Sequence, residues 1–137
     1  MIIDAPAEFW DWVDRLEVEA MNGSRRAGEK LDLVQALLEE LEDLKRAPTK
    51  EDETATLKWV RQSRRNLLWR VAHPYREGVA VRLICWFPPR DDETVVVALF
   101  AGDKAPIGDV FYDSVGHRAD PLIEQWKREV QRSRTNE

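Results

Sequence analysis

The sequence predicts an α+β fold with a helical hairpin, a four-stranded antiparallel sheet and a last helix, in that order. In the first third of the chain, apolar residues recur with a period near 3.6. From about residue 56 to residue 101 the period changes to two, which is typical of strands. The linkers between those strands are short, so neighbouring strands are expected to pair antiparallel. We therefore expect one domain over 1–137, with the hairpin in 1–50, the sheet in 54–101, a loop in 102–118 and a helix in 119–131.

Three segments carry the helical pattern. The first spans 7–21, with Pro6 placed to start it and Asn22-Gly23-Ser24 placed to end it. The second spans 25–46 and stops at Ala47-Pro48; its apolar stripe consists of Leu31, Val34, Leu37, Leu38, Leu41 and Leu44, and acidic residues occupy the opposite side. The third begins at Asp120-Pro121 and turns Leu122, Ile123, Trp126 and Val130 inward. These helices are expected to cover one face of the sheet and to leave the other partly open.

The strands are predicted at 56–61, 67–72, 79–87 and 94–101, separated by segments with turn chemistry. Alternation puts Arg82 on one face of its strand with Ile84 and Trp86, and Arg70 on one face with Leu68 and Ala72. Two arginines from central strands can thus converge on one face. Because an unpaired buried guanidinium is very unfavourable, we consider two interpretations equally. The arginines either form structural ion pairs, for instance with Asp103 or Asp109, or bind phosphate with their planar forks.

The charge of the chain is unevenly distributed. The net charge is −5, yet residues 58–90 contain eight basic residues and only Glu77 as an acid. The basic residues of this segment are Lys58, Arg61, Arg64, Arg65, Arg70, Arg76, Arg82 and Arg90. This excess predicts a surface for phosphates or for an acidic partner. The alternative is a solvated strand edge whose arginines prevent aggregation.

Composition excludes several classes of protein. The single cysteine, Cys85, allows no internal disulfide and fits a reducing cytosol. The first residues have acids where a signal peptide needs bases, and no apolar run is long enough for a membrane helix. We expect a cytoplasmic protein with no membrane partner. The sequence shows no cluster of metal ligands and no Walker or dinucleotide motif, so we expect no cofactor and no metal.

Polar residues follow the last predicted strand, where packing does not require them. Lys104 can stabilise developing negative charge, and Tyr112 can donate or accept a proton. The alternative for Tyr112 is an aromatic anchor for the last helix. His73 and His117 are further candidates for a general acid or base, but single histidines in turns are usually surface residues.

The order of these elements and several short motifs resemble the RelE/ParE superfamily of toxins from type II toxin–antitoxin systems. PAEFWDWVDRL and the Leu-rich stretch after it resemble the opening helix pair of that superfamily. SRRNLLWRV, VAVRLICWF and VVVALFAGDKAPIGDVFYD resemble its second, third and last strands, and they are most like the HigB-type, phage-derived branch. The resemblance covers about residues 6–130 and depends on the order of the motifs more than on any one of them.

This resemblance implies an mRNA endoribonuclease that acts on the ribosome and inhibits translation. The RNA 2′-hydroxyl would attack the adjacent phosphate without a metal. Arg82 would stabilise the phosphate, Tyr112 would transfer a proton or stack on a base, and Lys104 would supply the basic position after the last strand. Arg70, Asp113 and His73 are further catalytic candidates, and the residues expected to bind RNA are Lys58, Arg61, Arg64, Arg65 and Arg76. Residues 102–118 would then be the active-site loop.

The resemblance also implies a partner and leaves an alternative. The partner is a cognate antitoxin, expected to carry a helix-turn-helix DNA-binding domain. The chain departs from ribosome-dependent members in being acidic overall and in having only Lys104 where some relatives have a run of bases. The ParE branch inhibits DNA gyrase instead of cutting RNA. A gyrase-inhibiting toxin, or a catalytically inactive binding module of the same fold, therefore stays open.

Overall fold

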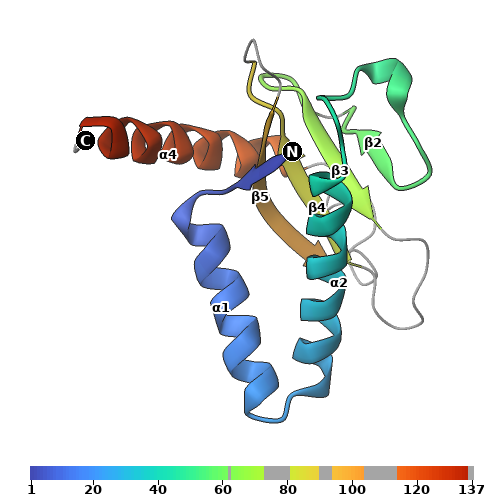
Figure 1. Cartoon of the computed structure of the whole chain (residues 1–137), viewed down its shortest axis with the longest axis vertical. Helices are drawn as coiled ribbons and strands as arrows, with labels where there is room; N and C mark the ends of the chain where they lie inside the picture. Colours follow the sequence, from blue (N-terminus) through green and yellow to red (C-terminus); the bar gives the residue numbers. More distant parts are fainter. Residues whose placement is uncertain (62, 73–80, 90–93, 104–113, 136–137) are drawn as a thin grey trace.

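The computed structural model of the chain describes residues 1–61, 63–72, 81–89, 94–103 and 114–135, and of residues 103, 134 and 135 it describes the backbone alone. In these ranges the fold is α+β, as predicted (Figure 1). The elements in chain order are β1 (Ile2–Asp4), α1 (Ala7–Met21), α2 (Arg25–Glu42), the 3₁₀ helix η1 (Lys50–Asp52), β2 (Leu57–Trp59), β3 (Leu68–Ala72), β4 (Val81–Trp86), β5 (Val95–Asp103) and α4 (Val115–Thr135).

The sheet has five strands in the order β1-β5-β4-β3-β2. β2 to β5 pair antiparallel, but β1 pairs parallel with β5, so the sheet is mixed. The prediction of a four-stranded, purely antiparallel sheet is therefore wrong. β1 has three residues, too few to show an alternating pattern. Its backbone is held at the start by Ile2, whose N–H donates to the carbonyl of Thr94 at 2.7 Å.

The helices lie on both faces of the sheet. The α1–α2 hairpin packs on one face, where Phe9 and Leu37 meet Leu83 and Cys85. α4 crosses the other face, where Ile123 and Trp126 belong to a second cluster with Ile84 and Trp86. In Figure 1, α4 runs crosswise to the two helices of the hairpin. The expectation that all helices cover one face is wrong, because α4 packs on the face opposite the hairpin.

Helix ends follow local chemistry. α1 has the predicted bounds, and Gly23 follows it with a φ of +97°, a conformation that suits glycine. Ser24 caps α2, since its hydroxyl oxygen accepts a hydrogen bond from the Ala27 N–H at 3.2 Å. α2 ends at Glu42, four residues earlier than predicted.

α4 begins at Val115, before the predicted start at Asp120-Pro121. Pro121 therefore lies inside the helix, where it removes one backbone hydrogen bond. Val115 and Ala119 are both buried against the sheet. Their burial explains why the helix starts earlier than the proline indicates.

A bulge shapes β5. Ile84 of β4 pairs with Phe100, but the next residue, Cys85, pairs with Ala98, so Leu99 is an extra residue in β5. Leu99 and Phe100 consequently both belong to the cluster on the α4 side of the sheet. The bulge thus places the ring of Phe100 on the same face as the arginine of β4.

Candidate nucleic-acid interface

Three basic side chains from three neighbouring strands lie on the α4 side of the sheet. Lys58 of β2 pairs with Arg70 of β3, and Arg70 pairs with Ile84 of β4. Arg82 is two residues from Ile84 along β4, so it points to the same face. Diagonal neighbours of this kind have Cα atoms about 7–8 Å apart. The predicted convergence of Arg70 and Arg82 on one face is confirmed, and Lys58 extends the set to the edge of the sheet.

Arg82 is half-buried, and its polar atoms are poorly satisfied. Its Nη1 donates a long hydrogen bond of 3.4 Å to the carbonyl of Val81. Its Nε is buried and has no hydrogen-bond partner among the described residues. A buried donor without a partner is unfavourable, so this guanidinium is arranged for something outside the described chain or for a ligand. Arg70 is also half-buried and makes interactions of its own.

The three cations lie toward one end of the sheet. At the other end, Leu68, Trp86 and Val97 form one cross-strand row, and α4 packs over it. Arg82 pairs with Gly102, and both are only half-buried by the described residues. We call Lys58, Arg70 and Arg82, together with Arg118 described below, the basic face.

Arg118 of α4 is a cation that the sequence patterns did not single out. Its guanidinium carbon lies 4.2 Å from the centre of the Phe100 ring, a cation–π contact. Phe100 pairs with Ile84, so Arg118 stands over the sheet beside the position of Arg82. Arg118 makes no ion pair with a carboxylate that the structure describes. Sequence patterns missed Arg118 because residues 115–118, the first turn of α4, were assigned to the predicted loop 102–118.

The other predicted RNA-binding cations are placed differently. Arg61 makes an ion pair with Glu53 at 3.1 Å and stacks on Trp59. Arg65 lies in the turn before β3, and its guanidinium is 3.7 Å from Glu124 of α4. Arg64 is exposed in the same turn. These three residues are therefore not part of the basic face, although all of them are accessible to solvent.

The remaining predicted site residues lie outside the described residues. They are His73, Arg76, Lys104, Tyr112 and Asp113. The suggested carboxylate partners of the arginines cannot be placed either, since Asp109 and the side chain of Asp103 are also outside. Of the predicted catalytic residues, the structure therefore describes Arg70 and Arg82.

Two further observations bear on chemistry. The described residues hold no group of three or more His, Cys, Asp or Glu side chains that could bind a metal ion. Burial raises the pKa of the Cys85 thiol well above its usual range, because desolvation disfavours the thiolate. Cys85 is therefore a buried core residue whose thiol is not activated for attack.

Among the described helices, none is both long enough and apolar enough to span a bilayer.

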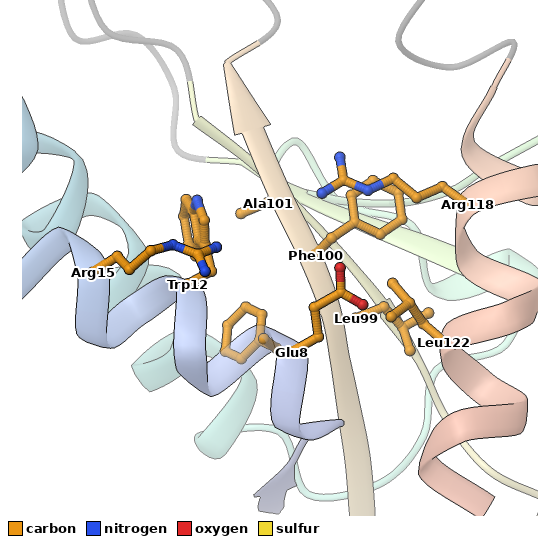
Figure 2. A pocket seen from close by; sticks show the side chains of 9 residues that line it. Glu8, Trp12, Arg15, Leu99, Phe100, Ala101, Arg118 and Leu122 are labelled. Atoms are coloured by element: carbon orange, nitrogen blue, oxygen red, sulfur yellow. The ribbon is translucent and has the colours of Figure 1, made fainter.

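A small hollow adjoins the basic face, between α1, β5 and α4 (Figure 2). Leu99, Phe100 and Ala101 of β5 contribute to its lining. Charged side chains come from both flanking helices, Glu8 and Arg15 from α1 and Arg118 from α4. The hollow has a volume of about 40 Å³. Since one water needs about 10–15 Å³ by the same measure, the hollow has room for a few waters or for the oxygens of a small anion.

No family model, no curated protein and no solved structure matches this chain.

Proposed function

We propose that the chain is the toxin of a type II toxin–antitoxin pair and cuts mRNA, as its resemblance to RelE/HigB-type toxins implies. The observation that supports this most is the half-buried guanidinium of Arg82. Its buried Nε lacks a described partner, and it shares a sheet face with Arg70 and Lys58. Polyanion binding explains this arrangement, because arginine's planar fork matches phosphate.

The proposed reaction needs no group other than the RNA and the protein side chains. The RNA 2′-hydroxyl oxygen attacks the adjacent phosphorus, and the bond from phosphorus to the 5′-oxygen breaks. The products are a 2′,3′-cyclic phosphate and a 5′-hydroxyl, with one proton moved from the 2′-oxygen to the 5′-oxygen. Arg82 and Arg70 stabilise the negative charge that develops on the phosphorane. The resemblance alone supports the other proposed groups, which would transfer protons or stabilise charge: Tyr112, Asp113, His73 and Lys104.

The basic face also fits the proposed antitoxin. An acidic or apolar segment of the antitoxin would cover Arg82 and Arg70, and thereby block RNA. The antitoxin is proposed to carry a helix-turn-helix DNA-binding domain, and the RNA is proposed to be message on the ribosome.

Inducible expression in bacterial cells, followed by mapping of mRNA 5′ ends, tests this function. We expect growth arrest and new 5′-hydroxyl ends within translated messages soon after induction. Arg82→Ala should abolish both. Arg25→Ala is the matched control, since Arg25 is an exposed arginine at the start of α2 whose only described ion pair is with Glu29. It should act as the wild type does.

Two results would contradict the proposal. If cells arrest without new mRNA ends while plasmid supercoiling is lost, the target is gyrase, as in the ParE branch. If induction changes neither growth nor mRNA ends, the chain is a binding module without nuclease activity.

A further inference from the structure

We infer that the hollow between α1 and α4 binds a second phosphate of the RNA, held by Arg15 and Arg118. This inference rests on the proposed function and extends the RNA path beyond Arg82, across β5 to the first helix. It concerns residues that neither the sequence motifs nor the resemblance assigned.

The first support is the pair of arginines. Arg15 comes from α1 and Arg118 from α4, and both line the hollow from opposite sides of β5 (Figure 2). Both are exposed, and neither makes an ion pair with a described carboxylate. Two cations from separate elements that face one small space favour an anion between them.

The second support is the size and floor of the hollow. Its volume of about 40 Å³ holds a few water-sized groups, such as the oxygens of a phosphate. Its floor is the buried strand β5. The guanidinium carbon of Arg118 lies 4.2 Å from the centre of the Phe100 ring. A guanidinium held near an aromatic ring can still donate its N–H groups to a ligand.

The third support is continuity with the basic face. Phe100 and Arg82 lie on the same side of neighbouring strands, so Arg118 borders both the hollow and the basic face. From Lys58 on β2 to Phe100 on β5 the sheet crosses three strand spacings of about 4.8 Å each. A single RNA strand laid across β2, β3, β4 and β5 would leave the sheet at the hollow.

Glu8 allows a test in which a substitution should strengthen RNA binding instead of weakening it. It is an exposed carboxylate on the wall of the hollow, on the same helix as Arg15 (Figure 2). A carboxylate beside a phosphate weakens its binding. If the hollow holds phosphate, removing this negative charge must strengthen RNA binding. If the two arginines serve only the fold, removing it must not.

The experiment measures the Kd of purified protein for a short fluorescein-labelled single-stranded RNA by anisotropy, over a series of salt concentrations. Arg15→Gln and Arg118→Gln should each weaken binding by about tenfold and lower the salt slope by about 0.7, the value for one lost single-strand phosphate contact. Glu8→Gln should tighten binding by roughly threefold. Arg25→Gln changes the net charge equally but lies at the far end of the hairpin, so it should leave the slope unchanged.

The outcomes separate this inference from the proposed function. If the wild type binds RNA and produces new mRNA ends, but Arg15→Gln and Arg118→Gln behave as Arg25→Gln does, the second phosphate position is wrong and the nuclease stands. Glu8→Gln with no tighter binding than wild type would also overturn it. If the wild type neither binds RNA nor produces ends, the proposed function fails, and the inference fails with it. Thermal unfolding of each variant shows that the fold is intact, as expected for exposed side chains.

Discussion

At the residue scale, Arg82 places a charged side chain where the sheet otherwise carries apolar ones. Ile84 and Trp86, its neighbours on the same face of β4, are buried in the core. Its buried Nε, which no described residue satisfies, is available to a ligand or to a residue outside the described ranges. Residues that act on ligands often have this property, because a site arranged for a partner is unsatisfied without it.

If this nitrogen serves a ligand, Arg82→Met should separate stability from function. Methionine keeps most of the side-chain volume and removes the buried Nε. We expect the free energy of unfolding to stay within about 1 kcal/mol of wild type or to rise, while growth arrest is lost. Urea denaturation and an expression assay measure the two effects. A large loss of stability, with toxicity retained, would instead indicate a structural ion pair.

Cys85 gives a second prediction at this scale. Burial raises the pKa of its thiol, so almost none is ionised at pH 8, and the side chain is closed to solvent. Iodoacetamide should leave Cys85 unmodified in the native protein and modify it fully in denaturant, as read by mass spectrometry. Rapid modification of the native protein would show that β4 is not in the core.

At the scale of elements, sequence patterns predict those segments best whose period is long and regular. The bounds of α1 match, and strand alternation places Arg70 and Arg82 on one face. β1 could not be predicted, since three residues carry no period and its parallel pairing with β5 depends on residues almost a hundred positions away. The start of α4 was predicted too late because tertiary burial of Val115 and Ala119 outweighs the proline signal. Arg118 was missed as a consequence.

The placement of α4 depends on contacts distant in sequence. Trp126 Nε1 donates to a carboxylate oxygen of Asp4 at 2.9 Å, and the other oxygen of Asp4 accepts from the Ala5 N–H at 2.8 Å. The Ala7 N–H donates to the carboxylate of Glu129 at 3.1 Å. These bonds join α4 to the connection between β1 and α1. No local pattern encodes them, which is why the face that α4 covers was not predicted.

We therefore predict that Trp126→Phe lowers the free energy of unfolding by about 1–3 kcal/mol, through the lost hydrogen bond and the smaller ring. Urea denaturation measures it, with Trp10→Phe as control, since Trp10 is 38 % exposed. A double-mutant cycle with Asp4→Ala should give a coupling energy of about 1 kcal/mol. If the two effects simply add, the bond does not hold α4 in place.

At the scale of the whole molecule, charge is segregated between layers. The acidic residues gather in the first 57 positions, largely in α1 and α2, whereas Lys58, Arg70, Arg82 and Arg118 lie on the opposite side of the sheet. A net charge of −5 thus coexists with a locally basic face. A polyanion responds to the local charge of the surface that it meets, so the acidic total does not exclude a polyanion site on this face.

We propose that the basic face binds RNA through Arg82, and a measurement of RNA affinity tests this most directly. Anisotropy with a short single-stranded RNA should give a Kd for Arg82→Met about tenfold or more above that of wild type. Its salt slope should be shallower by about 0.7, while Arg25→Gln keeps the wild-type slope. Equal Kd values and equal slopes for wild type and a correctly folded Arg82→Met would contradict the claim.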